Sequence, residues 1–462
     1  MAYTETTSTG FFSRLGNSFS GIGMGLVLAI AGTVLLWWNE GDFVATRDAL
    51  NETQAQTQVV GEAANLGPSF SGKVVHVTGY ADTKQTLNDS EFGISQNAIA
   101  LVRRVEYYQW TETSEQTKRQ KLGGGEETVT VYNYHTKWVK DPVNSNAFHD
   151  PAARSGKVNY TYLQAKGRVV RATEVSFGPA RLPDFLISSI SGEKPFDIQM
   201  SQEVKNAISQ NIYRAFPELR PITMAPVSNT QSSFDQRVAQ AAPAQNAPLA
   251  PAQTVENKSA VVQMVSNVLN PVTGGEVVHV SGNTLYIGLT PGAPKVGDVR
   301  ITYHAIYPGD ISLIAKYNGS TFERVYASNG KTVSRLNMGV VGSDAMFGKA
   351  HSSNSTWTWI LRVVGTFLVI GGLKAIVAPL SVLASVIPLL GTIVGAGTGI
   401  VCTLLGLAWS LIIISIAWLR FRPIVGGAML GVAVLLIAVL YIKGRSKKAA
   451  PAAPQAPQAP AE

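Results

Sequence analysis

The stretch GIGMGLVLAIAGTVLLWW, residues Gly21–Trp38, decides the fold class because it carries no charged residue in 18 positions. A hydrocarbon core about 30 Å thick requires a helix of roughly this length. Trp37 and Trp38 close the run, as aromatic residues do at a membrane interface. Because the run is longer than the apolar core of a signal peptide and no A-x-A site follows it, we interpret it as a retained membrane anchor.

Three further apolar runs lie near the other end of the 462-residue chain, at residues 357–378, 393–419 and 424–442. The last two are separated only by RFRP, Arg420–Pro423. A share of 45% hydrophobic against 15% charged residues is typical of a membrane protein. We therefore predict a multi-pass α-helical membrane protein with four transmembrane helices.

Basic residues near the helix ends indicate the orientation. The flank KGRSKK follows the last run with four basic residues, whereas Arg14 is the only one before the first run. This predicts a cytoplasmic N-terminal tail at residues 1–20, a basic and then Pro/Ala-rich cytoplasmic tail at 443–462, and a central region on the other side. The arginines of RFRP go against this trend. The net charge of +8 is assigned to membrane flanks, so no nucleic-acid partner is expected.

The central region has strand character and one helix. Residues 98–110 and 127–139 are rich in β-branched and aromatic residues, which favour strands. Apolar residues recur every four positions between Ser201 and Phe216, which predicts an amphipathic helix. We predict a large β-rich α+β extramembrane domain. It divides into a first part at 39–218, a Pro/Ala/Gln-rich linker at 219–253 and a second part at 254–356.

One phrase occurs twice in this region, as VVHVTG at Val74–Gly79 and VVHVSG at Val277–Gly282. The repetition indicates two related β units, each with a strand and a glycine turn, and independent convergence is the alternative. His76 and His279 hold the same place in the two copies. We interpret both as hydrogen-bonded or exposed strand residues.

Glycines four residues apart occur in the membrane runs and favour close helix contacts in lipid, within one copy or between copies. The predicted helix-contact residues are Gly21, Gly25, Gly391, Gly395, Gly399, Gly427 and Gly431. Arg362 and Lys374 lie near opposite ends of the second run, where both are expected to extend to the interfaces. Residues 379–392 contain two prolines and read either as an interfacial or re-entrant segment or as a helical extension of the third run.

No pattern for catalysis, cofactor binding or metal binding is found in the sequence. The six histidines show no paired short spacing, and the single cysteine, Cys402, lies in the third run. His149 and Asp150 could form an acid and base pair, but no nucleophile elbow or phosphate loop accompanies them. We predict no catalytic, cofactor or metal site and expect no cofactor.

Several strings resemble the transmembrane protein 43 family, also called LUMA: WNEG at Trp38–Gly41, VEYYQW at Val105–Trp110, GDVRITY at Gly297–Tyr303 and RFRP. The resemblance covers most of the chain outside the linker and termini. It implies four spans and a large non-cytoplasmic domain, with animal members acting as membrane organisers in the endoplasmic reticulum and nuclear envelope. It brings no catalytic residues. The linker and the tail APQAPQAPAE depart from the animal pattern, and we expect a bacterial plasma membrane, with the endoplasmic reticulum and nuclear envelope as the alternative.

The resulting hypothesis is a non-enzymatic integral membrane scaffold that associates through its helices and presents a periplasmic or lumenal interaction domain. Its expected partners are membrane lipids, further copies and other membrane proteins. Two alternatives stay open. A pore-forming or channel-regulating transport subunit would have a conductance sensitive to Gly395, and a lipid-modifying enzyme would require His135, His149 or Asp150.

Overall fold

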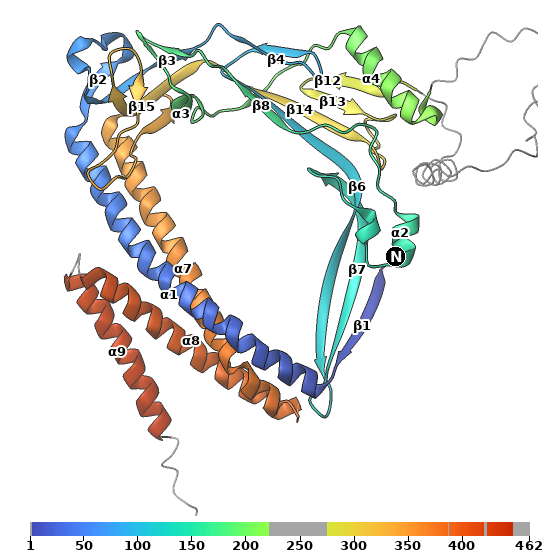
Figure 1. Cartoon of the computed structure of the whole chain (residues 1–462), viewed down its shortest axis with the longest axis vertical. Coiled ribbons are helices and arrows are strands. Elements are labelled where there is room, and N and C mark those ends of the chain that lie inside the picture. Colours follow the sequence, from blue (N-terminus) through green and yellow to red (C-terminus); the bar gives the residue numbers. More distant parts are fainter. Residues whose placement is uncertain (1, 221–274, 387, 420–422, 447–462) are drawn as a thin grey trace, which may run out of the picture.

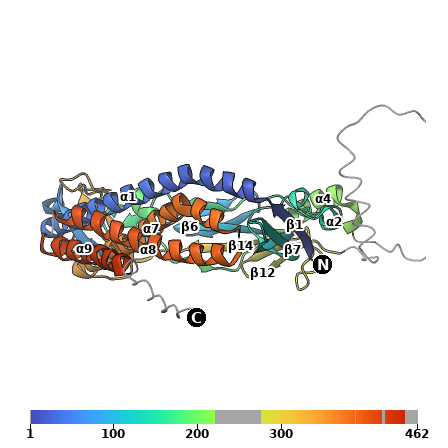
Figure 2. The same ribbon diagram turned by 90° about the horizontal axis from the view of Figure 1, so that it is seen from below.

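A computed structural model describes residues 2–220, 275–386, 388–419 and 423–446. Long helices form one side of the molecule, and two β-sheets with a long hairpin form the rest, so that the outline in Figure 1 is a closed ring. Figure 2 shows that the ring is thin, with the helices side by side in front of the strands.

Four long helices contain the apolar runs: α1 Phe11–Gln56, α7 Ser343–Ala384, α8 Pro388–Leu419 and α9 Pro423–Ser446. Within the described residues, three helices are long and apolar enough to cross a membrane, namely α1, α7 and the Val394–Leu419 part of α8. The expected combination of membrane helices and a large β-rich region is therefore confirmed. Since parts of α9 lie outside the residues whose side chains are described, the count of four crossings stays a prediction.

The helices extend well beyond the apolar runs. At 1.5 Å per residue the 46 residues of α1 span about 69 Å, so its last turns reach the β-region that the sequence assigns from residue 39. The region 379–392 is helical at both ends, because α7 continues through the buried Pro379 to Ala384 and α8 begins at Pro388. Its place in or against the bilayer stays a prediction. Packing against neighbouring helices lets a membrane helix tolerate such a proline.

The first sheet joins the two halves of the central region. Its main strand order is β1 Tyr3–Thr9, β7 Glu126–Val139, β6 Ala100–Gln120, β14 Val299–Ile306, β13 Thr284–Ile287 and β12 Val278–Ser281. The short strands β8 Arg168–Arg171 and β11 Lys194–Pro195 pair with β6 and β14. Because β14 lies antiparallel to β6, with Ile301 opposite Val105, the two predicted parts fold as one body.

The second sheet packs beside the upper ends of α1 and α7 (Figure 1). It contains β10 Ala180–Arg181, β9 Ser176–Phe177, β3 Val74–Asp82, β15 Gly309–Tyr317 and β16 Phe322–Glu323, with β2 Gln58–Glu62 and β17 Arg335–Met338 at its sides. A small third sheet pairs β4 Thr86–Asp89 with β5 Ile94–Asn97. Val75 and Val77 of β3 and Leu313 of β15 are fully buried, and they belong to one core with residues of the first sheet.

The other α-helices in the described part of the chain are short: α2 Pro151–Gly156, α3 Asp184–Ile187 and α4 Gln202–Ala215. Helix α4 confirms the predicted amphipathic helix, since Ile208 and Ile212 are buried and the Ser201 hydroxyl accepts a hydrogen bond from the Val204 amide. Leu219 is only 1% exposed, so the core extends into the first residues assigned to the linker. From residue 221 onward the linker lies outside the described residues.

The two copies of the repeated phrase occupy different positions. Strand β3 lies inside the second sheet, paired with β15 and β2, whereas β12 pairs with β13 at the end of the first sheet's main strand order. The closing glycines also differ, because Gly282 adopts a φ of 55° in a turn while Gly79 continues the strand. The expectation of a glycine turn is wrong for the first copy. At Gly79 an added Cβ would lie 2.6 Å from the Ala63 Cβ, so close packing requires glycine there.

The N-terminal residues are not a free tail. Tyr3–Thr9 form strand β1, which runs antiparallel to β7 with Thr6 opposite Val129, and α1 begins at Phe11. The expectation of a tail at residues 1–20 is therefore corrected. In Figure 1 this strand lies beside the β6–β7 hairpin where the hairpin meets the lower end of α1. We call β1, β7 and residues 108–120 of β6 the hairpin arm.

Candidate functional site

A buried ion pair lies where the membrane helices meet the β-region. The Glu40 side chain on α1 is fully buried, and the Arg362 side chain on α7 is 12% exposed. Arg362 donates two hydrogen bonds to the two carboxylate oxygens of Glu40, from Nε at 2.6 Å and from Nη2 at 2.7 Å. This bidentate geometry is the strongest form of an arginine–carboxylate pair.

Aromatic and amide groups complete this charge cluster. The indole N–H of Trp418 on α8 donates to Glu40, and the Arg362 guanidinium lies 4.7 Å from the Trp359 ring centroid and 5.4 Å from that of Trp418. Beside Glu40, the side-chain amide of Asn39 donates to the backbone carbonyl of Thr358 on α7 at 3.2 Å. The charge cluster therefore holds α1, α7 and α8 together at one level.

This pairing was not predicted from the sequence, where Arg362 is expected to extend to the interface. In the structure the guanidinium instead has a buried acceptor, the Glu40 carboxylate. The signal was present, since Glu40 follows the first apolar run within WNEG and Arg362 is one of two basic residues in the second. A charge that stays buried has to be paired. Because Arg362 and Glu40 are 322 residues apart in the sequence, no local pattern identifies Glu40 as the partner of Arg362.

Glycines at two levels allow α1 and α7 to pack closely. A Cβ added at Gly25 would lie 2.8 Å from the Gly372 carbonyl oxygen, and one added at Gly32 would lie 2.8 Å from that of Gly365. Such distances are too short for a side chain. Of these four residues only Gly25 belongs to the predicted helix-contact set. That set was chosen by a spacing of four residues, whereas the contacting glycines are seven residues apart on both α1 and α7.

The other predicted helix-contact glycines are placed differently. A Cβ at Gly395 on α8 would lie 3.9 Å from Ser381 Oγ on α7, which is ordinary contact. An added Cβ would meet no atom within 4 Å at Gly21, Gly399, Gly427 or Gly431. Gly391 belongs to α8 but lies among residues whose side-chain surroundings are outside the description. Contacts between copies through these glycines stay a prediction.

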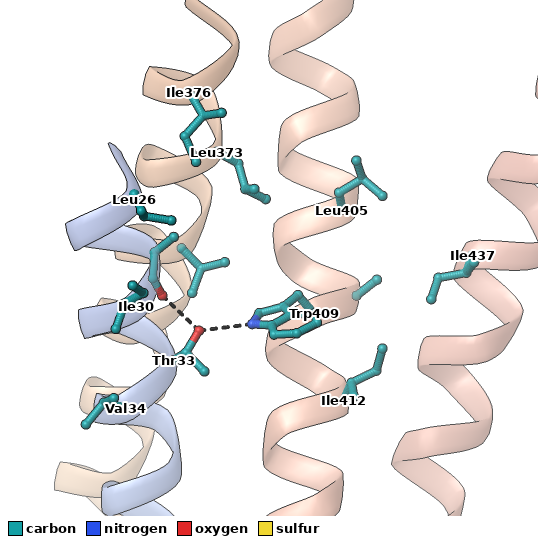
Figure 3. A pocket seen from close by; sticks show the side chains of 13 residues that line it. Leu26, Ile30, Thr33, Val34, Leu373, Ile376, Leu405, Trp409, Ile412 and Ile437 are labelled. Atoms are coloured by element: carbon teal, nitrogen blue, oxygen red, sulfur yellow. Dashed lines mark hydrogen bonds between the residues drawn. The ribbon is translucent and has the colours of Figure 1, made fainter. Parts of the chain in front are cut away.

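An apolar pocket of about 510 Å³ lies between α1, α7 and α8. Figure 3 shows its lining side chains, with Ile437 of α9 on the far side. The lining residues are Leu26, Ala29, Ile30, Thr33, Val34, Val369, Leu373, Ile376, Leu405, Ala408, Trp409, Ile412 and Ile437. The Trp409 indole donates to the Thr33 hydroxyl at 3.0 Å, and that hydroxyl donates to the Ala29 carbonyl at 2.8 Å. With its polar groups paired and no ionisable residue in its lining, the pocket suits hydrocarbon and lacks groups for acid–base chemistry.

The proposed acid and base residues do not converge on a reactive centre. Asp150 caps α2 by accepting from the Ala152 amide at 2.8 Å. The His149 ring lies 2.7 Å from Glu112, which also accepts from the Tyr134 hydroxyl at 2.6 Å. Burial raises the pKa of Glu112, but the hydrogen bonds from Tyr134 and His149 outweigh it and lower that pKa below its ordinary value. These residues tie the hairpin arm to the loop before α2.

The paired histidines of the repeated phrase also have structural partners. His76 Nε2 lies 2.9 Å from the Val341 carbonyl, and His279 Nε2 lies 3.0 Å from the Gly288 carbonyl. They belong to different sheets, as their strands do. Over the residues that the structure describes, no group of three potential ligands could hold a metal ion.

A buried carboxyl in the first sheet predicts a pH-dependent stability. Burial raises the pKa of Asp298 from 3.8 to about 6, although the Lys295 amide and the Tyr286 hydroxyl donate to it. Between these values the folded protein binds more protons than the unfolded chain. The contribution of Asp298 to the stability of the folded protein is therefore greatest below pH 4 and is lost as the pH rises through 6.

Replacement by asparagine should remove this dependence. Asp298→Asn keeps an oxygen for both donors but does not ionise, so the loss of about 2 to 3 kcal/mol between pH 4 and pH 7 that the shift represents should largely disappear. Thermal unfolding of the detergent-solubilised protein across this range measures it. Equal pH dependence in the variant and the parent would contradict the assignment.

Comparison with known proteins places the chain in a family. The family model for Transmembrane protein 43 matches residues 107–423. Transmembrane protein 43 of Rattus norvegicus is 23% identical over 95% of this chain and 93% of its own length, and that of Homo sapiens is 22% identical over 96% and 95%. The Drosophila melanogaster homologue is 23% identical over 88% of this chain and 90% of its own. No solved structure matches the chain.

The match fits the architecture described above. It covers β6 from Tyr107 onward, β7, the second half of the β-region, and α7 and α8. The names of the family and of these relatives denote a membrane protein and no enzymatic activity. With three membrane-length apolar helices among its described residues and a large β-rich region, this integral membrane protein belongs to the Transmembrane protein 43 family.

Proposed function

We propose that this protein is a non-enzymatic membrane scaffold. Its apolar helices hold it in the bilayer and associate with further copies or with other membrane proteins, while the β-rich region binds a partner outside the bilayer. The absence of ionisable groups from the apolar pocket lining supports a binding role over catalysis. The relatives' names, which denote no activity, support it as well.

The observation that carries this proposal is that Gly427 and Gly431, four residues apart on α9, have no neighbouring atoms in contact distance of an added side chain. An added Cβ at Gly427 or Gly431 would meet no atom within 4 Å, and Gly399 on α8 is equally open. Glycines four residues apart let two helix backbones approach closely in lipid. By contrast, Gly25 and Gly372 already pack against each other within one copy. The helix face with Gly427 and Gly431 is therefore available for contact with a second copy.

Crosslinking in native membranes tests the association. The parent protein should yield defined oligomers or one reproducible neighbour, and Gly431→Leu should reduce that product several-fold while the protein still inserts. Val432→Phe is the matched control, because it adds bulk about 100° away around the same exposed helix. Monomers alone in the parent, or equal products in all three proteins, would count against the scaffold.

We further propose that the β-rich region faces the periplasm of a bacterial plasma membrane and that the basic C-terminal flank faces the cytoplasm. An endoplasmic reticulum or nuclear envelope membrane, with the β-rich region in the lumen, is the alternative. A single cysteine at the exposed Asn133, in a Cys402→Ala background, should react with an impermeant reagent only from the periplasmic face. Reaction from the cytoplasmic face alone would refute this orientation.

A further inference from the structure

The apolar pocket between α1, α7 and α8 exists because α1 and α8 each pack closely against α7 but not against each other. At the glycine contacts described above, α1 leaves no room for a Cβ beside α7, and a Cβ added at Gly406 on α8 would lie 2.5 Å from the Ile370 side chain of α7. Between α1 and α8, by contrast, the Trp409 indole reaches across to Thr33 (Figure 3). A bulky side chain therefore sets the distance between α1 and α8 at this level, and the space beside its ring stays open.

The pocket lies near the middle of the membrane-spanning segments. Its lining on α1 runs from residue 26 to residue 34, within the uncharged run 21–38, and its lining on α8 runs from 405 to 412, within Val394–Leu419. At 1.5 Å per residue this lining extends over about 12 Å. It therefore occupies the central part of a hydrocarbon core about 30 Å thick, where the ends of acyl chains lie.

One side of the pocket is open to the bilayer. The residues at this side come from α1 and α8, and their exposed fractions lie between 45% and 55%: Leu26, Ile30, Leu405 and Trp409. At the back of the pocket Val369 of α7 is only 1% exposed. A lipid chain can therefore enter sideways between α1 and α8, and the close contact of α1 with α7 closes the floor beneath it.

The lining excludes other kinds of occupant. It contains no charged residue, and its two polar side chains, Thr33 and Trp409, are bonded to each other, so an ionised ligand finds no partner there. Water requires two to four polar partners, and apolar cavities stay dry. A helix about 10 Å wide would occupy roughly 900 Å³ over about 12 Å of length, which is more than the pocket volume of about 510 Å³. A hydrocarbon chain remains.

We propose that this pocket binds the terminal part of one acyl chain of a bilayer phospholipid. The chain fills the space beside Trp409 and so completes the packing of α1 against α8. Because the pocket lies at mid-depth, the headgroup of the bound lipid is about 15 Å away, near the membrane surface. The site therefore selects a hydrocarbon chain and not a headgroup. The inference does not rest on the scaffold role.

Photo-crosslinking locates the chain. The full-length protein is reconstituted into phosphatidylcholine vesicles that contain a phosphatidylcholine with a diazirine at the end of one acyl chain, extracted into mild detergent to remove the surrounding lipid, and then illuminated. The label should concentrate on Ile30 and Trp409, several-fold above Phe367. This control residue is 68% exposed on α7 outside the pocket and lies at the same depth, between Gly365 and Gly372. Equal labelling of the three residues, or none in the pocket, would overturn the proposal.

A pair of neighbouring variants tests the pocket itself. Leu26→Trp places a larger side chain in the exposed part of the lining and should reduce the labelling of Trp409 several-fold. Val27→Trp is the matched control, because it adds the same ring about 100° away around α1, at an exposed position outside this pocket. Undiminished labelling in Leu26→Trp, or equal losses in both variants, would contradict the site.

A change of headgroup tests what the site selects. A phosphatidylglycerol with the same diazirine chain should label Trp409 as strongly as the phosphatidylcholine does, because no charged residue lines the pocket. A several-fold preference for either lipid would show that a headgroup is recognised and would overturn the proposal. None of these results bears on the oligomers that test the scaffold.

Discussion

Replacing Glu40 by alanine is expected to destabilise the packed helices by about 3 to 5 kcal/mol, because it leaves the Arg362 guanidinium buried without its partner. The loss also removes the acceptor of the Trp418 indole on α8. Unfolding of the solubilised protein, followed by tryptophan fluorescence, measures the effect. Asp48→Ala is the control on the same helix, because its side chain is 54% exposed in its pair with Arg47, and it should cost less than about 1 kcal/mol.

The double variant separates the charge from the packing. If the uncompensated charge causes the loss, Glu40→Met with Arg362→Met should be more stable than either single variant, since no charge then remains buried. A Glu40→Ala variant as stable as Asp48→Ala would show that the guanidinium finds water or another acceptor. That result would remove the charge cluster as the element that holds the three helices at one level.

Gly372→Ala is expected to be the second most damaging change, with a loss of about 1 to 3 kcal/mol from overpacking. Its new Cβ would lie 2.5 Å from the Gly25 carbonyl oxygen and 2.7 Å from the Ala29 amide nitrogen. Both atoms are backbone, so no rotamer change relieves the clash, and α1 must move away from α7. Thermal unfolding in detergent measures the loss of stability.

The neighbouring glycine provides the matched control. At Gly371 an added Cβ would meet no atom within 4 Å, and alanine is favoured over glycine in a helix by up to about 1 kcal/mol. Gly371→Ala should therefore be neutral or stabilising, opposite in sign to Gly372→Ala. The same sign for both would mean that α1 and α7 are not in close contact at this level.

The sequence predicted the parts of this protein whose structure depends on local composition. An uncharged run such as Gly21–Trp38 excludes a water-exposed helix whatever the rest of the chain does, and α4 follows from its own spacing of Ile208 and Ile212. The β-rich character of residues 98–139 is equally local, since β-branched and aromatic side chains fit a pleated surface. The family strings lie within these same elements.

Long-range pairing could not be predicted in this way. The sequence YTETTST at Tyr3–Thr9 contains four threonines and a tyrosine, which favour strands, but nothing in it indicates that its partner is β7, 117 or more positions away. The same holds for Gly372, whose need to be glycine exists only because Gly25 lies against it. Single-helix patterns record which face is apolar but not which helix covers it.

By itself the sequence determined that this protein has membrane helices and a large β-rich region, because hydropathy and strand propensity are properties of consecutive residues. Only the tertiary structure decided that Glu40 meets Arg362 and that the N-terminal strand closes the ring onto the hairpin arm. These are contacts between residues more than one hundred positions apart. The free energy that selects them comes from burial and pairing, which exist only once the chain has folded.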